Sequence, residues 1–326
     1  MKKRHIIFFF ASLAIFALML DAVGIDSLIH GFSQIKPHYI PVLAALTFLE
    51  FYLEVCKIQV YFRRLDVHKP FWRVFYTYYL GIPVAFITPS RPIGELGRAV
   101  IFKKKLSIST NQALTATAAE RIIDLVFLIA VAASGLFLFV GVGSSFPINQ
   151  LLILGGIFFG LLFSSFAFLL SSRLQGIFFS ILGKLENLIK LNFSSLIREY
   201  FESFRKVVVN KKILGLSLFY NTLLWGADFL RVWLLFQMFS VDVSYFAVAA
   251  ITSASYLLGI LSQLPGGLGA FEASSVGLYS LIAVPPEIAI PAIFIERLFS
   301  YWSYIVVGGA LLVREGLKID FERVHR

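Results

Sequence analysis

Two Glu-Arg pairs, Glu120-Arg121 and Glu296-Arg297, lie within long and otherwise apolar stretches of the chain. A charged residue at the centre of a membrane helix costs roughly 2.5–3.5 kcal/mol, so such groups must pair, face water or contact a ligand. Neighbouring helical residues point about 100° apart, so each Glu needs a partner other than the Arg that follows it. A guanidinium offers a planar fork of donors that suits phosphate. We therefore weigh two roles for each Arg, contact with a phosphate group and an ion pair that clamps the fold.

A polar break that contains proline and glycine precedes each pair. The breaks are residues 89–98 and 264–272, and in both cases the same number of residues separates the proline from the glutamate of the pair. Glycine lets backbone N–H groups turn towards a ligand, and the start of a half-helix carries partial positive charge, so both breaks suit phosphate. The alternative for each break is a tight turn with close helix packing.

The segment 40–62 places three charged residues, Glu50, Glu54 and Lys57, along one face of a predicted helix. Three such groups on one face are too many for contact with lipid, so we expect this face to line a polar cavity. Coupling of protons or cations through Glu50 or Glu54 is a hypothesis for this cavity.

Two further charged pairs have the i,i+3 spacing of neighbours on a helix, Arg121 with Asp124 and Asp228 with Arg231. Both pairs are within reach of an ion pair. For Asp228 and Arg231 we expect a self-contained ion pair inside the helix bundle.

Catalytic motifs are absent from the sequence. The five histidines lie outside the apolar segments or at their edges, and there is no HExxH, P-loop, GxSxG or Cys/His metal spacing. The single cysteine permits no intrachain disulfide and no thiolate cluster. We therefore expect neither an enzyme, nor a cofactor, nor a bound metal. The Tyr and Trp residues at 76–79, 225, 233 and 301–304 are interpreted as interface belts or packing.

The composition indicates an integral membrane protein. Of the 326 residues, 58% are apolar and only 15% are charged, and Phe alone contributes 35. An average soluble domain has about 25% charged residues. A soluble fold of this length cannot bury that much apolar surface. A soluble enzyme, a disordered chain and a disulfide-stabilised secreted module are excluded.

The net charge is +10, and most of the 29 Lys and Arg residues fall in one alternating set of connections between apolar segments. Such connections face the cytoplasm. We therefore predict a multi-pass protein of the cell (inner) membrane with cytoplasmic N- and C-termini. Because the basic residues follow topology and anionic lipid headgroups, we expect no nucleic-acid partner.

We predict an all-α polytopic membrane protein with about six full transmembrane helices and two re-entrant helical hairpins. The six spans are residues 6–23, 40–62, 111–140, 150–171, 211–239 and 287–313. The hairpins are 71–105, whose second arm is too polar to cross lipid, and 243–284. Eight full spans are the alternative. Residues 173–212 are predicted to be a cytoplasmic amphipathic segment.

The matched breaks and Glu-Arg pairs indicate an internal repeat within one integral membrane domain, residues 1–326. The first repeat is residues 40–140 and the second is residues 213–313. The chain enters the first hairpin from the cytoplasm and the second from outside, so the two repeats have inverted topology. Secondary transporters with this architecture bind substrate near the bilayer midplane, where broken helices meet.

The runs GELGRAVIFKKK, ALTATAAERIIDL, QLPGGLGAFE and AIFIERLFSYW resemble the lysylphosphatidylglycerol synthase transmembrane-region family, also called the flippase-like domain family. This family forms the membrane half of multiple peptide resistance factors. The resemblance extends over about residues 5–315 and implies an all-helical inner-membrane protein that handles lipids. The motif positions that it implies for substrate binding are Arg91, Glu95, Arg98, Glu120, Arg121, Pro265, Gly266, Gly267, Glu272, Glu296 and Arg297.

In the best-understood members of this family the membrane part moves an aminoacylated phospholipid between leaflets, and some related proteins serve polyprenyl-linked sugars. The resemblance therefore implies a lipid flippase whose ligand carries a phosphate-containing headgroup. Nothing after residue 313 corresponds to an aminoacyl-transfer domain, so we do not expect lipid synthesis. Two alternatives stay open: a secondary transporter of a small polar solute, and a non-catalytic subunit that supports a partner transferase.

Overall fold

A computed structural model of the chain describes residues 36–88, 91–141 and 209–316, together with single positions elsewhere. Side chains in the second range are described for residues 94–135. The described residues form helices joined by short connections, with no strand among them. The predicted spans 6–23 and 150–171, and most of the segment 173–212, lie outside the described residues.

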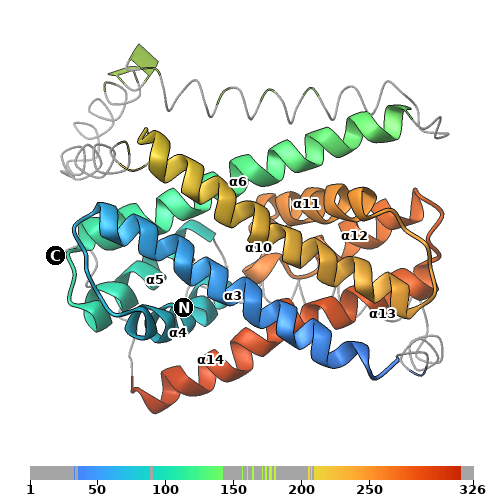
Figure 1. Cartoon of the computed structure of the whole chain (residues 1–326), viewed down its shortest axis with the longest axis horizontal. Helices are drawn as coiled ribbons and strands as arrows, with labels where there is room; N and C mark the ends of the chain where they lie inside the picture. Colours follow the sequence, from blue (N-terminus) through green and yellow to red (C-terminus); the bar gives the residue numbers. More distant parts are fainter. Residues whose placement is uncertain are drawn as a thin grey trace, which may run out of the picture.

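Four helices are described in the N-terminal half, and Figure 1 shows their arrangement. They are α3 (Tyr39–Arg64), α4 (Phe71–Ile87), α5 (Arg91–Leu106) and α6 (Thr110–Gly141). Ser109 caps α6, because its hydroxyl accepts from the Gln112 N–H at 3.1 Å and the Gln112 side chain accepts from the Ser109 N–H at 3.0 Å.

The C-terminal half contains the remaining described helices. They are α10 (Lys211–Met238), α11 (Tyr245–Leu261), the short 3-10 segment η1 (Pro265–Gly267), α12 (Ala270–Ser280), α13 (Pro286–Arg297), the π-helical segment η2 (Leu298–Trp302) and α14 (Ser303–Arg314). The last three follow one another without a gap, so the predicted span 287–313 is one helix with a π-helical turn directly after Arg297.

Three helices in the described part of the chain are long and apolar enough to cross a membrane. They are α3, α10 and the continuous helix Pro286–Arg314. The helix α6 has 32 residues and carries the charges of the first Glu-Arg pair in its N-terminal part. A membrane helix needs about 20 residues, so α6 also exceeds the required length.

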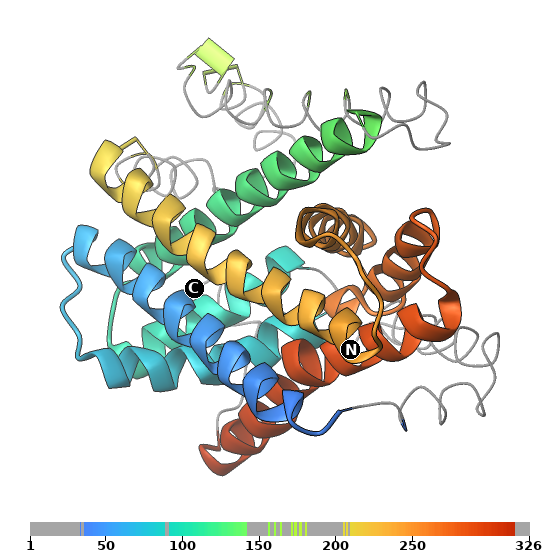
Figure 2. The ribbon, with the colours of Figure 1, turned by 45° about the vertical axis from the view of Figure 1, so that its right-hand side comes forward.

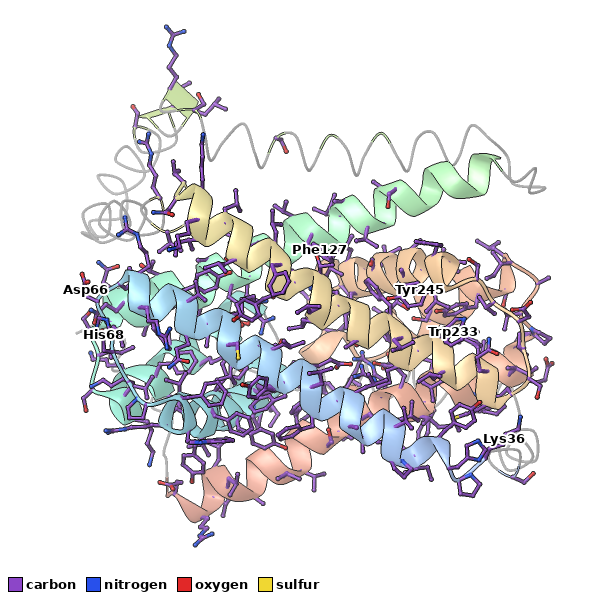
Figure 3. All side chains as sticks on the ribbon, viewed as in Figure 1. Lys36, Asp66, His68, Phe127, Trp233 and Tyr245 are labelled. Atoms are coloured by element: carbon purple, nitrogen blue, oxygen red, sulfur yellow. The ribbon has the colours of Figure 1, made fainter. Side chains whose placement is uncertain are left out.

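The helices α3 and α10 lie side by side and run in opposite directions (Figures 1 and 2). The Lys36 side chain, before the start of α3, lies 3.5 Å from the Ser240 hydroxyl beyond the end of α10. Lys36 lies at one end of α3, and Asp66 and His68 lie at the other (Figure 3). This pair of helices joins the two halves of the protein.

Each half has its own apolar core. In the N-terminal half, Tyr61 and Phe62 pack with Phe102 of α5 and Ala116 of α6. In the C-terminal half, the second core is built from buried side chains of α10, α11, α12 and α13. Within each half the two arms around a break pack on one another, α4 on α5 and α11 on α12.

The two halves also contact one another. The first arm of each break, α4 or α11, packs on a long helix of the other half. The helix α4 packs on α14, where a Cβ added to Gly308 would lie 2.6 Å from the Pro83 ring. The helix α11 packs on α6, where a Cβ added to Gly135 would lie 2.0 Å from the Ala250 Cβ. Glycine permits both close approaches, and the halves therefore interlock.

A polar contact ties the end of α14 to the first pair of arms. The Tyr76 hydroxyl donates to the Glu315 carboxylate at 2.5 Å, and Lys105 forms an ion pair with the same carboxylate. These hydrogen bonds from Lys105 and Tyr76 lower the pKa of Glu315 below its ordinary value.

Candidate substrate cavity

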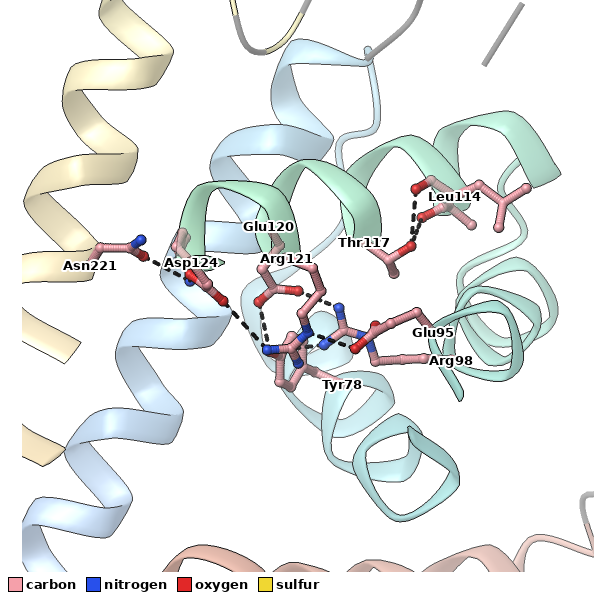
Figure 4. Close-up of polar contacts among 11 residues, drawn as sticks. Tyr78, Glu95, Arg98, Leu114, Thr117, Glu120, Arg121, Asp124 and Asn221 are labelled. Carbon is pink, nitrogen blue, oxygen red and sulfur yellow. Dashed lines mark hydrogen bonds and ion pairs between the residues drawn. The ribbon is translucent and has the colours of Figure 1, made fainter. Parts of the chain in front are cut away.

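The arginines of the two Glu-Arg pairs each bind a carboxylate from the second arm of the nearby break. The Nε of Arg121 donates to Glu95 of α5 at 2.6 Å (Figure 4), and the Nε of Arg297 donates to Glu272 of α12 at 2.6 Å. Both contacts follow the predicted clamp. In both halves, therefore, the Nε of the arginine ties its helix to a glutamate of the second arm.

The glutamate of the first pair has different partners. Glu120 pairs with Arg98 of α5 and accepts from the Tyr78 hydroxyl at 2.7 Å (Figure 4). Arg98 also donates to Tyr78 at 3.1 Å, and its Nε lies 2.8 Å from Glu95. Arg98, Glu120 and Tyr78 are fully buried. This network locks α4 and α5 onto α6.

Lys57 joins three helices at one point. Its ammonium donates to Asp124 of α6 at 2.5 Å and to Asn221 of α10 at 2.9 Å. The predicted contact between Arg121 and Asp124 is present but long, at 3.4 Å, because the other oxygen of Asp124 is held by Lys57. Lys57 itself is fully buried.

Arg231 of α10 lies among three carboxylates. It pairs with Asp228 on its own helix, with Glu50 of α3 and, at 3.3 Å, with Glu296 of α13. The predicted Asp228–Arg231 contact therefore exists, but the prediction of a self-contained pair is wrong. The other two partners lie on helices distant in sequence, so the i,i+3 spacing alone did not reveal them. Glu296 also accepts from the Tyr256 hydroxyl at 3.4 Å.

The second break is a turn whose N–H groups have internal partners. Gly266, Gly267 and Gly269 have φ values of +58°, +70° and +83°, which favour glycine. The Gly267 N–H donates to the Leu264 carbonyl at 2.9 Å, and the Gly269 N–H donates to Glu272 at 2.6 Å. In the first break, Gly94 and Gly97 lie inside α5. These findings favour the predicted alternative of a tight turn over a phosphate cradle of backbone amides.

A cavity of about 110 Å³ lies between the two halves and is partly open to the outside. Residues of both halves line it. They come from α3, α4 and α6 in the N-terminal half and from α10, α11, η1, α13, η2 and α14 in the C-terminal half. Its charged lining residues are Glu50, Glu54, Arg121, Asp124, Asp228 and Arg297. Its aromatic lining residues are Phe86, Trp225, Tyr256, Tyr301 and Tyr304. The arginines of both pairs thus face the same cavity.

The end of α4 and the turn of the second break meet at the wall of this cavity. Phe86, near the end of α4, stacks on Tyr301 with ring centroids 5.1 Å apart. The Tyr301 ring in turn covers Gly266, whose carbonyl accepts from Arg297 at 3.2 Å. The cavity is therefore bounded by the first arm of one break and the turn of the other.

The comparisons with known proteins agree with the sequence motifs. A family model described as the lysylphosphatidylglycerol synthase TM region matches residues 6–308. The chain belongs to this family. It is 24% identical to a UPF0104 membrane protein of Pyrococcus horikoshii, with 96% of this chain and 97% of that protein aligned. UPF0104 membrane proteins of Methanothermobacter thermautotrophicus and Methanocaldococcus jannaschii are 25% and 26% identical, over 98% and 94% of this chain and 98% and 93% of their own lengths.

The family positions occupy two kinds of place in the structure. Arg121, Arg297 and Gly266 line the cavity, whereas Glu95, Arg98, Glu120, Glu272 and Glu296 lie behind it in ion pairs. Pro265 and Gly267 are buried in η1. The backbone of Arg91 starts α5, and its side chain is outside the described residues.

Sequence reasoning missed part of the lining. Trp225, Tyr301 and Tyr304 were interpreted as interface or packing residues, and Tyr256 was not singled out, yet all four face the cavity. Aromatic residues are common in membrane helices. In the sequence, only the positions of neighbouring charges could have distinguished these cavity-lining residues from residues of an interface belt.

Proposed function

We propose that the protein is a lipid translocase that moves a phospholipid or a polyprenyl-linked lipid between the two leaflets. The observation that carries this proposal is the cavity between the halves, lined by both motif arginines and by aromatic side chains. Polar groups buried in a membrane protein usually face a substrate or ion pathway. Membership of the lysylphosphatidylglycerol synthase TM-region family supports a lipid as the cargo.

The lipid headgroup would contact the guanidinium N–H groups of Arg121 and Arg297 that are not used in their ion pairs. Among the described residues, the Nη2 of Arg121 and the Nη1 of Arg297 form no hydrogen bond, because Nε and the other Nη hold carboxylate or carbonyl oxygens. Each guanidinium would present this donor to a headgroup phosphate. The acyl or prenyl tails would stay in the bilayer.

In this proposal the protein is a multi-pass component of the cell membrane with both termini in the cytoplasm. The arms α4–α5 and α11–α12 are the two re-entrant hairpins of the inverted repeat, and their movement against the long helices exchanges access. The protein performs no covalent chemistry itself. A separate transferase would supply or consume the lipid.

Reconstitution into liposomes tests the proposal. Purified protein and headgroup-labelled lipids of several classes are combined, and an external quencher then reports how fast inner-leaflet label becomes accessible. We expect acceleration over protein-free liposomes for at least one class. If no class is accelerated, the lipid proposal is refuted and a supporting subunit becomes the better interpretation.

Variants separate a substrate contact from a clamp. Arg121→Ala removes the donor but also leaves Glu95 with one partner fewer, so Glu95→Gln/Arg121→Gln serves as the neutral comparison. We expect both to slow translocation. Arg73→Ala is the control, because Arg73 is exposed and its side chain bonds only the Lys105 carbonyl among the described residues, away from the cavity.

A transporter of a small polar solute is the second candidate, favoured by one observation. Glu54 lines the cavity and forms no hydrogen bond or ion pair with any described residue. A carboxylate left open to a cavity suits a cationic solute. Uptake of labelled solutes in the same liposomes, without lipid movement, would favour this candidate over a translocase.

A further inference from the structure

The two halves differ in how their buried charges balance. In the N-terminal network three cations meet three carboxylates, namely Lys57, Arg98 and Arg121 with Glu95, Glu120 and Asp124. Each positive charge there has a negative partner. These ion-paired groups balance one another and serve as an internal reference for the other half. Glu54 of α3 lies beside them and faces the same cavity, with no ion pair among the described residues.

The second network carries an excess of carboxylates. Arg297 pairs with Glu272, so Arg231 is the one cation that pairs with the other carboxylates of this network. We call the Arg231 cluster the group formed by Arg231 with Glu50, Asp228 and Glu296. Three carboxylates around one guanidinium leave two negative charges uncompensated if all are ionised. Uncompensated charge inside a protein of low dielectric constant is costly, and such groups neutralise by taking up protons.

The carboxylates of the Arg231 cluster have oxygens that are available to bind protons. Glu50, Asp228 and Glu296 are 8%, 4% and 0% exposed. One oxygen of each, Oε1 of Glu50, Oδ2 of Asp228 and Oε2 of Glu296, is buried and has no hydrogen-bond partner in the described structure. A buried oxygen without a donor is an unusual state for a carboxylate, and a bound proton would resolve it.

The cluster is connected to the cavity and to several charged neighbours. Glu50 and Asp228 line the cavity, so the cluster lies at the cavity wall. The groups that face Glu50 are Asp228 and Arg231 from α10, Glu296 from α13, and Tyr304 from α14. Glu54 lies one turn away on α3. Among the described residues no group of His, Cys, Asp or Glu side chains has an arrangement that holds a metal ion, which favours a proton over a bound metal cation.

We propose that the Arg231 cluster is a proton-binding site that exchanges protons with the cavity. A hydronium ion transfers its proton to a carboxylate oxygen, for example Oε1 of Glu50, and leaves as water. The Arg231–Glu50 pair joins α10 of the C-terminal half to α3 of the N-terminal half. Protonation of Glu50 replaces this ion pair with a weaker neutral hydrogen bond. Proton uptake therefore loosens one contact between the halves.

A coupling role follows if the protein is a transporter, and this part rests on the proposed function. Movement of one half against the other changes which side of the membrane the cavity faces. A proton that binds on one side and leaves on the other would then drive that movement. The proton site itself does not depend on which cargo is carried.

Infrared spectroscopy tests the site directly. Purified wild-type protein is titrated from neutral to alkaline pH, and the C=O stretch of protonated carboxyl groups is identified by its shift in D2O. We expect a band that disappears on alkalinisation. Glu50→Gln and Asp228→Asn should each lower the number of bound protons and reduce the area of the band, because each removes one excess negative charge.

Glu120→Gln is the matched control, because it makes the same change at an equally buried glutamate in the balanced network. It should leave the band unchanged. Absence of the band in the wild type, or an equal loss in Glu120→Gln, would overturn the proposal. If Glu50→Gln does not fold, Asp228→Asn and Glu296→Gln provide the same comparison.

Transport measurements distinguish this proposal from the proposed function. In the labelled-lipid liposomes, an imposed pH gradient should change the wild-type rate, and Glu50→Gln should lose this response. Lipid movement without the infrared band and without a gradient response would refute the proton site and leave the translocase. The band without movement of any lipid would support the proton site and refute the translocase. A gradient response that requires Na⁺ would overturn a proton as the coupled ion.

Discussion

Gly266 offers a sharp test of how closely the turn of the second break packs on the cavity wall. Its φ is +58°, and a Cβ added there would lie 2.0 Å from Cε2 and 2.7 Å from Cζ of Tyr301. The Tyr301 ring cannot move aside easily, since it is buried, stacked on Phe86 and in edge contact with Trp302. We therefore predict that Gly266→Ala strongly destabilises the fold.

The expected magnitude has two parts. A non-glycine residue in the left-handed region costs roughly 1–2 kcal/mol. Overpacking of a filled core costs typically about 1–3 kcal/mol. Together these predict that the free energy of unfolding falls by about 2–5 kcal/mol. Removal of the ring by Tyr301→Ala in the same chain should recover the overpacking part, about 1–3 kcal/mol, as a favourable interaction energy in a double-mutant cycle.

The assay is unfolding of purified protein in detergent, with Gly309→Ala and Gly277→Ala as matched controls. Both control positions are helical, and an added Cβ there meets nothing within 4 Å. Alanine should stabilise them by about 0.4–1 kcal/mol. If Gly266→Ala is as stable as the controls, the Tyr301 ring does not cover Gly266 as described, and the reasoning about this part of the cavity wall is refuted.

Three other perturbations have defined outcomes. Glu120→Ala should lower the free energy of unfolding by about 3–5 kcal/mol because it leaves the buried Arg98 without its main partner, and Arg98→Met/Glu120→Met should recover much of that loss in the same unfolding assay. Gly308→Ala should weaken the contact between α14 and α4 and lower the unfolding temperature, whereas its neighbour Gly309→Ala should not; equal behaviour of the two would contradict the close packing. Because contacts with α4 and α5 lower the pKa of Glu315, its contribution to stability is present at neutral pH and is lost as the pH falls through that lowered pKa. Glu315→Gln should remove this acid-dependent part of the unfolding curve, and an unchanged acid limb would show that the contact contributes nothing.

Much of the helical arrangement could be predicted from the chain. Apolar length and the charges that bound it predicted α3 and α10 closely, and the polarity of residues 88–105 predicted that α4 and the following segment form a separate unit. The π-helical turn after Arg297 could not be predicted, because it arises where the chain packs around the second break. Whether the arms re-enter or cross the bilayer is a question of depth, which apolar content alone does not answer.

The site could be predicted in part. The cost of burying charge predicted that Arg121 and Arg297 need carboxylate or ligand partners, and each has a carboxylate. Which carboxylate depends on packing between helices distant in sequence, so Arg231 was assigned one partner where it has three. Local spacing predicts neighbours along one helix, whereas contacts across the bundle require the fold.

The exchanged packing of the arms has a consequence for biosynthesis. The helix α4 is among the first described helices to leave the ribosome, yet the surface that covers it belongs to α14, near the end of the chain. Until α14 is inserted, that side of α4 must face lipid, water or an insertion factor. Maturation of the first arm therefore waits for α14, the last helix that the structure describes, and a chain truncated before residue 303 would leave that side of α4 permanently uncovered.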